Sequence, residues 1–135
     1  MRGADKKSES QTVVVVCLDG ISWDYIEAAE TPFLDMIRRE GFATTCRAMV
    51  PTVTNVNNAS IITGAFPDEH GISTNSYYDP DTDEEVYMDS SRFLTCQTLL
   101  ERETNLGGRT LLLTVKDKLR RLLARGVTAS YSTEK

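Results

Sequence analysis

Thr12-Val-Val-Val-Val-Cys-Leu-Asp-Gly20 is the stretch that decides the fold class. Its β-branched residues follow one another without polar alternation, which is typical of a strand buried on both faces of a parallel sheet. Asp19 stands at the carboxyl end of this predicted strand, and ligands of open α/β sheets bind outside the carboxyl ends of strands. Asp19 is therefore a candidate metal ligand or general base, or alternatively a cap for the turn that follows.

Helical and extended patterns alternate along the rest of the sequence. The chain is predicted to continue with a helix over 22–40 that restarts at Thr31-Pro32, a strand over 42–50, a short helix over 54–64 and a hairpin over 77–88. A helix over 92–105, a strand over 109–115, a helix over 117–126 and a strand over 127–131 follow. This order predicts an α/β fold, layered as α/β/α with a mainly parallel sheet and a small β-hairpin insertion. Residues 1–11 are predicted to be a mobile leader, followed by a domain over 12–135.

Composition and charge exclude several classes of protein. The 135 residues include 15 Lys+Arg and 20 Asp+Glu, and the resulting net charge of −5 argues against sequence-independent nucleic-acid binding. No apolar run approaches the roughly 20 residues of a membrane span, so we expect a cytoplasmic protein with neither nucleic-acid nor membrane partners. The three cysteines are widely spaced without a CxxC pair, which predicts buried, reduced thiols.

Thr54 lies at the start of the helix predicted over 54–64. A hydroxyl at a helix N-terminus faces the positive end of the helix dipole, where backbone N–H groups also favour a phosphate or phosphonate. Taken alone, a threonine at this position is more commonly explained as an ordinary helix cap.

Lys116, Lys118, Asn75 and His70 are the other polar residues singled out by position. If the chain is still extended after the strand over 109–115, Lys116 and Lys118 point to the same side and could clamp a dianion. Alternatively, they belong to a basic, solvated helix face. Asn75 could donate an amide hydrogen bond to a ligand oxygen or serve as a turn residue, and His70 is predicted to be a structural hydrogen-bonding residue.

Several ordered motifs together resemble the alkaline phosphatase superfamily, within it the type I phosphodiesterase/nucleotide pyrophosphatase branch. They read Val-Cys-Leu-Asp-Gly at 16–20, Pro-Thr-Val-Thr-Asn-Val-Asn-Asn-Ala-Ser-Ile-Ile-Thr-Gly at 51–64, Pro-Asp-Glu-His-Gly-Ile-Ser-Thr-Asn at 67–75 and Tyr-Asp-Pro at 78–80. The Thr-Asn-x-Asn-Asn form at 54–58 and Val-Lys-Asp-Lys-Leu at 115–119 look most like the phosphonoacetate hydrolases.

The resemblance implies a two-zinc hydrolase that cleaves the C–P bond of phosphonoacetate to give acetate and phosphate. It assigns Asp19 as a ligand of one zinc and Thr54 as the nucleophile, with its oxygen on that zinc. It also implies that Asn75 contacts the phosphonyl oxygens, while Lys116 and Lys118 hold the phosphonate and carboxylate ends of the substrate. The alternative within this branch is a nucleotide pyrophosphatase/phosphodiesterase.

The sequence lacks most of the metal ligands that this family uses. The family's further Asp and His ligands lie downstream of the nucleophile, and the sequence contains one histidine, in a loop that is not a ligand motif. Asp19 and Thr54 fall short of two zinc sites with about four ligands each. We therefore expect a truncated N-terminal portion that is inactive alone, or a remnant or anion-binding module, with uncovered apolar surface that favours homo-oligomers or other self-association.

Overall fold

The computed structural model describes residues 11–134. The predicted leader over 1–11 therefore lies, except for Gln11, outside the described residues. The chain divides into two compact units, residues 1–44 and residues 45–135, and each is described by itself. Among the described residues, no helix has the length and apolar character needed to cross a bilayer.

The described residues of the first unit form two short helices, α1 (Trp23–Ala28) and α2 (Pro32–Glu40). The predicted break at Thr31-Pro32 is confirmed, because Pro32 begins α2 and Thr31 occupies the N-cap position. The Thr31 side chain makes no capping hydrogen bond. Gly41 follows the last residue of α2 and its N–H donates to the carbonyl of Ile37, which closes the helix as expected.

The two strands predicted over residues 12–18 and 42–50 are absent from the described structure. Both segments lack regular structure, and their apolar side chains are exposed, with Val13 at 78% and Phe42 at 84%. A β-branched run favours extended backbone, but a strand also needs a neighbour for its hydrogen bonds. Within residues 11–134 the ladders pair β1 with β2 and β3 with β4 only. The two strand predictions are therefore wrong for this structure.

The predicted burial of the cysteines is also wrong for two of the three residues. Cys17 and Cys46 are exposed, Cys96 is half-buried, and all three are free thiols. Cys17 and Cys46 lie in the two segments that form no strand, so the missing sheet explains their exposure.

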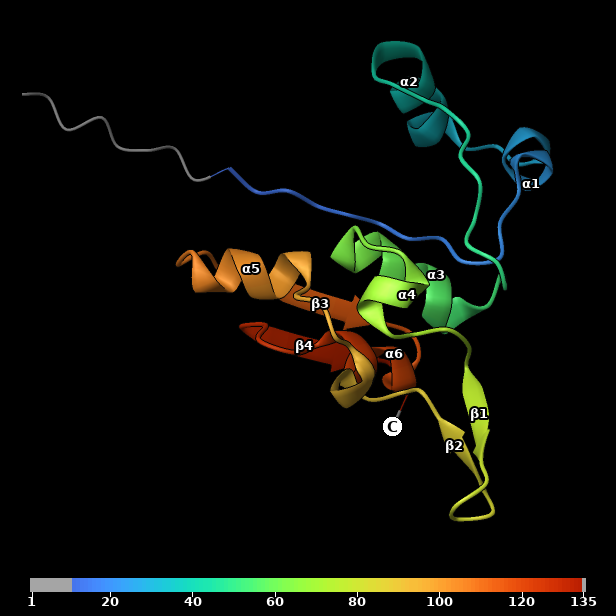
Figure 1. Cartoon of the computed structure of the whole chain (residues 1–135). Helices are drawn as coiled ribbons and strands as arrows, with labels where there is room; N and C mark the ends of the chain where they lie inside the picture. Colours follow the sequence, from blue (N-terminus) through green and yellow to red (C-terminus); the bar gives the residue numbers. More distant parts are fainter. Residues whose placement is uncertain (1–10, 135) are drawn as a thin grey trace, which may run out of the picture. The chain divides into compact units, whose positions relative to one another are not determined.

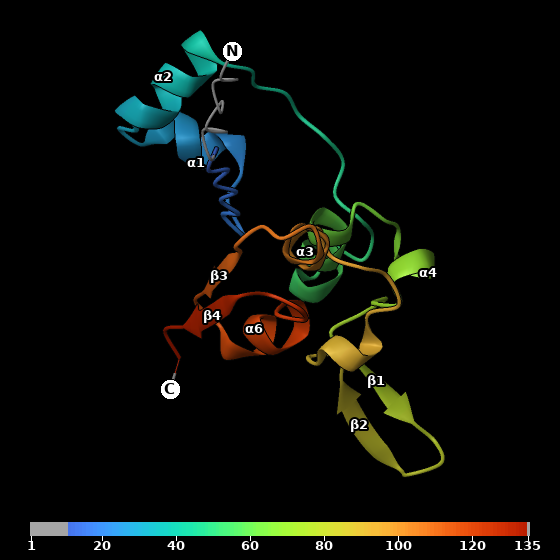
Figure 2. The ribbon, with the colours of Figure 1, turned by 90° about the vertical axis from the view of Figure 1, so that its left-hand side faces the viewer.

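The second unit holds the sheets and the larger core (Figure 1). It consists of α3 (Thr54–Thr63), α4 (Pro67–His70), β1 (Ser76–Asp79), β2 (Glu84–Tyr87), a 3-10 turn (Ser91–Phe93), α5 (Leu99–Asn105), β3 (Leu111–Thr114), α6 (Asp117–Leu123) and β4 (Ala129–Ser132). β3 and β4 are parallel, with Leu111 opposite Ala129, and α6 is their crossover (Figure 2). This β-α-β unit confirms the α/β class.

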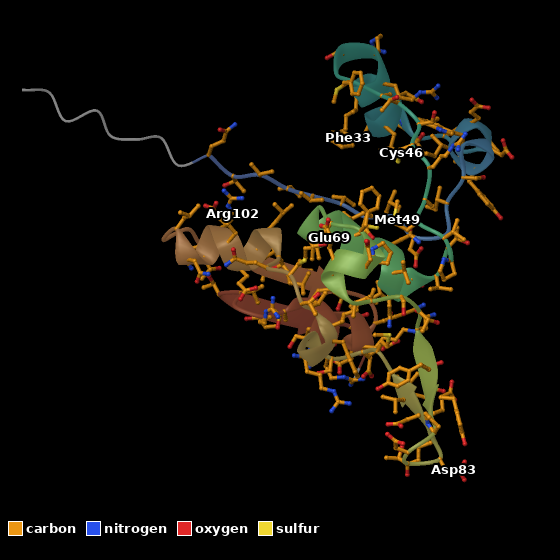
Figure 3. The ribbon with its side chains drawn as sticks, in the orientation of Figure 1. Phe33, Cys46, Met49, Glu69, Asp83 and Arg102 are labelled. Atoms are coloured by element: carbon orange, nitrogen blue, oxygen red, sulfur yellow. The ribbon has the colours of Figure 1, made fainter. Side chains whose placement is uncertain are left out.

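The predicted hairpin is present as the antiparallel pair β1 and β2, with Ser76 opposite Tyr87. Its turn is set locally, because Oδ1 of Asp79 accepts a hydrogen bond from the N–H of Asp81 at 3.0 Å. Figure 1 shows the hairpin projecting from the second unit, and Figure 3 labels Asp83 near its tip.

The helix predicted over 92–105 forms only in its second half. Thr98 is the reason, because its Oγ1 accepts a hydrogen bond from the N–H of Glu101 at 3.0 Å and so caps α5. A side-chain cap at this position starts the helix at Leu99. Residues Ser91–Phe93 form a separate 3-10 turn instead.

The core of the second unit gathers one side of α3, one side of α6 and the segments between them. Packing of α3 and α6 against this core holds their first turns in place, which matters because both turns carry candidate site residues. The buried apolar residues are Val56, Ala59, Ile72, Met88, Leu94, Leu122 and Leu123.

Candidate functional site

Thr54 is the first residue of α3 and is half-buried. The preceding residue, Val53, is extended, so the chain turns into the helix directly at Thr54. The carbonyl of Thr54 accepts from Nδ2 of Asn58 at 3.0 Å. A threonine oxygen at this position lies at the positive end of a ten-residue helix, which stabilises negative charge there.

The segment that leads into α3 is fastened by Asn57. Its Oδ1 accepts from the N–H of Met49 at 2.9 Å, and its Nδ2 lies 3.3 Å from the carbonyls of Met49 and Val53. Figure 3 labels Met49, which also packs against the core. These contacts fix the entry of the chain into the helix, and with it the backbone position of Thr54.

Asn75 lies at the same end of α3 as Thr54, although it is 20 residues further along the chain than its hydrogen-bond partner, Asn55. Its Oδ1 accepts a hydrogen bond from the N–H of Asn55, the second residue of the helix, at 3.1 Å. The structure therefore brings Asn75 to the helix end that begins with Thr54. Because a backbone N–H needs an acceptor, this bond also fixes which atom of the amide is the oxygen.

Lys116 and Lys118 lie at the start of α6, directly after β3. Lys116 is the N-cap residue and is exposed, whereas Lys118 is the second residue of the helix and is half-buried. The condition for their pointing to one side, an extended chain, is not met because the helix begins at Asp117. Both lysines therefore lie at the start of α6, which follows the carboxyl end of β3.

Asp117, between the two lysines, is the centre of an ion-pair network. Its carboxylate accepts from Arg120 Nε at 2.6 Å, from Arg121 Nη1 at 2.8 Å and from Ser132 Oγ at 3.1 Å. The hydrogen bond from Arg120, with the charges of both arginines, holds the pKa of Asp117 below its ordinary value. Arg121 also binds Asp89 at 2.6 Å. These arginines are therefore engaged with carboxylates, which leaves the lysines as the cations at this edge.

Asp19 lies in the first unit, in the turn at residues 19–20, and is exposed. The strand that was expected to present it is not formed, so its position at a strand end is not observed. Gly20 follows with φ of 76°, a backbone angle that glycine tolerates and that makes this turn sharp. The structure describes Asp19 only within its own unit.

His70 is fully buried, and both ring nitrogens are engaged in hydrogen bonds. Nδ1 accepts from the N–H of Ile72 at 3.1 Å, so the proton lies on Nε2, which faces Ser60 Oγ at 2.9 Å. Burial lowers the pKa of His70, although the nearby Asp68 carboxylate acts in the opposite direction. These two hydrogen bonds agree with the prediction that His70 is a structural hydrogen-bonding residue.

The stability of the protein is expected to fall as the pH drops below about 6.5, the ordinary pKa of histidine. Because burial lowers the pKa of His70 in the folded state, the unfolded state takes up the proton first. Neutral His70 thus contributes fully above the unfolded pKa, and its contribution is lost as the pH falls towards the folded pKa. Denaturant unfolding between roughly pH 5 and pH 7.5 should show a slope of up to about 1.4 kcal/mol per pH unit.

His70→Gln is the matched variant, because glutamine keeps an amide near Ser60 but does not titrate in this range. Its stability should depend less on pH than that of the wild type. The same slope in both proteins would show that His70 is not the source.

A two-zinc centre needs several His, Cys, Asp or Glu side chains close together. Among residues 11–134 no three His, Cys, Asp or Glu side chains gather as a metal site. His70 is already engaged in two hydrogen bonds, which leaves Asp19 and Thr54 as the ligands that the resemblance assigns. The described residues therefore do not fit a two-zinc centre by themselves.

Asn55 is a residue that the sequence did not single out. It is 1% exposed, and its Nδ2 donates to the carbonyl of Met88 at 2.8 Å. The available signal is weak: three asparagines stand within 54–58, and nothing local distinguishes the one that faces the core.

Most of the chain is similar to a known protein family. The family model described as type I phosphodiesterase / nucleotide pyrophosphatase matches residues 13–131. Among curated proteins, an uncharacterised pyrophosphatase/phosphodiesterase of Schizosaccharomyces pombe is 36% identical over 72 residues, covering 53% of this chain and 15% of that protein. Ectonucleotide pyrophosphatase/phosphodiesterase family member 5 of Homo sapiens is 34% identical over 79 residues, with the same coverages of 53% and 15%.

Two crystal structures of phosphonoacetate hydrolase from Sinorhizobium meliloti 1021 also match, both at 39% identity. The complex with phosphonoacetate has a TM-score of 0.69 and covers 76% of this chain and 25% of that chain. The complex with phosphonoformate has a TM-score of 0.74 and covers 82% and 28%. The likeness confirms the expected alkaline phosphatase-like α/β fold, and the chain spans about a quarter of the solved enzyme.

Proposed function

The chain belongs to the type I phosphodiesterase / nucleotide pyrophosphatase family, and from this premise we propose that it carries the nucleophile and the anion-binding residues of a phosphonoacetate hydrolase. The observation that carries the proposal is the hydrogen bond between the N–H of Asn55 and Oδ1 of Asn75, which joins the segments of Thr54 and Asn75 at one helix end. The 39% identity with the phosphonoacetate hydrolase of Sinorhizobium meliloti supports the substrate class.

The proposed reaction begins when the Thr54 hydroxyl releases its proton to solvent and its oxygen attacks phosphorus. The P–C bond breaks, the electron pair leaves with the CH₂ carbon, and that carbon takes a proton to give acetate. Water then attacks the phosphorylated Thr54, which releases phosphate and restores the hydroxyl. The first turn of α3 stabilises negative charge on the attacking oxygen, since a helix N-terminus carries roughly half a positive charge.

Substrate binding is assigned to the other three residues. Asn75 would donate from Nδ2 to a phosphonyl oxygen, because its Oδ1 is already occupied by the N–H of Asn55. Lys116 and Lys118 would neutralise the two anionic ends of phosphonoacetate. Asp117 is neutralised by Arg120 and Arg121, so it does not compete with the substrate for the lysines.

The zinc assignment remains part of the proposal, with Asp19 and Thr54 as two members of a ligand set that the described residues do not complete. Zinc would supply charge neutralisation and lower the pKa of a bound oxygen. Residues 11–134 alone do not provide its site.

A nucleotide pyrophosphatase/phosphodiesterase is the second candidate function. It is favoured by the two curated relatives reported above, which bear that description at 36% and 34% identity. The two functions differ in the substrate's carboxylate, which a phosphodiester lacks. A residue that contacts the carboxylate therefore separates them.

Lys118→Ala is expected to impair phosphonoacetate hydrolysis selectively. Loss of one charged hydrogen bond costs about 1.5–3 kcal/mol, which is roughly a 10- to 150-fold loss of kcat/KM. The product of the complete reading frame should be assayed for release of acetate and phosphate, beside hydrolysis of an aryl phosphodiester, on which the loss should stay below roughly 3-fold.

Arg102→Ala is the control for this experiment. Arg102 is an exposed cation on α5 (Figure 3), so its removal changes the net charge equally without touching α6. Equal losses on both substrates in Lys118→Ala would contradict the carboxylate contact. A wild-type protein that cleaves the diester but not phosphonoacetate would favour the second function.

Self-association and a cytoplasmic location are also proposals. Self-association is supported by Leu113 and Tyr131 on β3 and β4, which are 68% and 63% exposed. Apolar side chains side by side on a two-stranded sheet form a surface that other protein chains tend to cover. The location is supported by the three free thiols alone.

A further inference from the structure

Asn55 is a buried polar residue directly after Thr54. It is 1% exposed, and its Nδ2 donates to the carbonyl of Met88 at 2.8 Å. Its Oδ1 is buried and accepts no hydrogen bond within the part of the chain that the structure describes. An unpaired buried amide oxygen lowers stability. The residue is therefore poorly explained as core filling, and a different role has to account for it.

Asn55, Asn75 and Met88 form a closed ring of three hydrogen bonds. The N–H of Asn55 donates to Oδ1 of Asn75 at 3.1 Å. The N–H of Met88 donates to the carbonyl of Asn75 at 2.9 Å. The carbonyl of Met88 accepts from Nδ2 of Asn55 and completes the ring.

The ring connects three segments that lie far apart in the sequence. Asn75 immediately precedes β1, and Met88 immediately follows β2, so the two residues form the base of the hairpin. Asn55 is the second residue of α3. The Asn55 side chain is the link by which the helix holds the far side of the hairpin base, while the backbone N–H of Asn55 holds the near side.

We propose that Asn55 is a positioning residue, which holds the hairpin base against α3 and so fixes the amide of Asn75 relative to Thr54. The inference rests on the proposed function, in which Thr54 is the nucleophile and Asn75 binds a phosphonyl oxygen. Asn55 contacts neither the substrate nor the reacting atoms. It acts through Met88 and Asn75.

The kinetic signature follows from this division of roles. Without the Asn55 side chain, the backbone bond to Asn75 can still form, but the hairpin base is held on one side only. Phosphonoacetate still meets Lys116 and Lys118, and the backbone N–H of residue 55 still holds Asn75 beside α3, so binding changes little. The step in which the Thr54 oxygen approaches phosphorus depends on sub-ångström placement, so kcat falls.

The first arm of the test measures kcat and KM for phosphonoacetate in the product of the complete reading frame. Asn55→Ala should lower kcat by roughly 10- to 100-fold while KM changes by less than about 3-fold. Thr98→Ala is the stability-matched control. Thr98 is also 1% exposed, and its replacement by alanine also removes one hydrogen bond, the one that caps α5. Thr98→Ala should leave both constants within about 2-fold of the wild type. Equal losses of kcat in the two variants would overturn the proposal.

The second arm does not depend on activity. Amide hydrogen exchange at the N–H groups of Asn55 and Met88 should be at least about 10-fold faster in Asn55→Ala than in Thr98→Ala. Exchange rates at both N–H groups that are the same in Asn55→Ala as in Thr98→Ala would overturn the positioning role. If the wild type cleaves neither phosphonoacetate nor a phosphodiester, the proposed function fails and the exchange result alone decides the inference. Should Asn55→Ala not fold, Asn55→Ser is measured instead with the same criteria, because its hydroxyl is too short to replace the amide.

Discussion

Thr54→Ala is expected to abolish phosphonoacetate turnover while leaving the second unit folded. In the proposed reaction the Thr54 oxygen forms the bond to phosphorus, and no other group in the described structure is assigned that role. Removal of a covalent nucleophile lowers kcat by roughly 10⁴-fold or more. Alanine is a good helix former, and α3 is held by the burial of Val56 and Ala59. The loss of activity should therefore not be a loss of fold.

Thr63→Ala is the matched control for this experiment. Thr63 is the last residue of the same helix, and its hydroxyl donates to the carbonyl of Ala59 at 2.7 Å. The same side chain is removed from the opposite end of α3, so activity should be nearly unchanged. Thr54→Ser should recover part of the activity because it restores the oxygen. Turnover by Thr54→Ala within about 10-fold of the wild type would remove Thr54 as the nucleophile.

Elements set by short-range signals could be predicted from the sequence. Pro32 and Gly41 bound α2, Gly64 ends α3, and the turn over 79–83 joins β1 to β2, all as expected. Each of these depends on residues within a few positions of one another, so a single sequence contains the information. The parallel pair of β3 and β4 was also predictable, because α6 lies between two apolar runs.

The segments over 12–18 and 42–50 show the opposite case. Their composition favours extended backbone, yet a strand is a property of at least two segments. The partner is a long-range feature, and no local pattern specifies it. Asp19 was placed by this expectation, and its position at a strand end is therefore not observed in the structure.

The candidate site itself could be predicted only in part. Thr54 was placed at a helix start by the local pattern, and the structure agrees. The contact between Asn75 and the N–H of Asn55 spans 20 residues, and the contact between Asn55 and Met88 spans 33. The sequence left two alternatives for the lysine pair, an extended chain or a helix face, and the helix start at Asp117 rules out the first. Asp117 pairs with Arg120 and Arg121 three and four residues on, which favours that helix start.

Gly71→Ala is expected to destabilise the protein more than the same change at Gly64. Both glycines follow a helix with positive φ, 84° at Gly71 and 67° at Gly64. A Cβ at Gly71 would lie 2.6 Å from the carbonyl oxygen of Phe93, whereas a Cβ at Gly64 would meet nothing within 4 Å. Gly64→Ala therefore costs only the left-handed backbone, about 1–2 kcal/mol.

At Gly71 the clash adds to that cost, because a backbone oxygen cannot rotate away as a flexible side chain can. Relief requires the turn after His70 to move away from Phe93, which strains the hydrogen bond from the N–H of Thr95 to the carbonyl of His70 at 3.2 Å. We expect a loss of about 3 kcal/mol or more in the free energy of unfolding. Urea unfolding of both variants measures the difference, and equal losses would show that the Gly71 turn is not packed against Phe93 in solution. A larger loss of stability in Gly71→Ala than in Gly64→Ala would show that packing of the backbone against Phe93, and not the neighbouring His70 alone, fixes this turn.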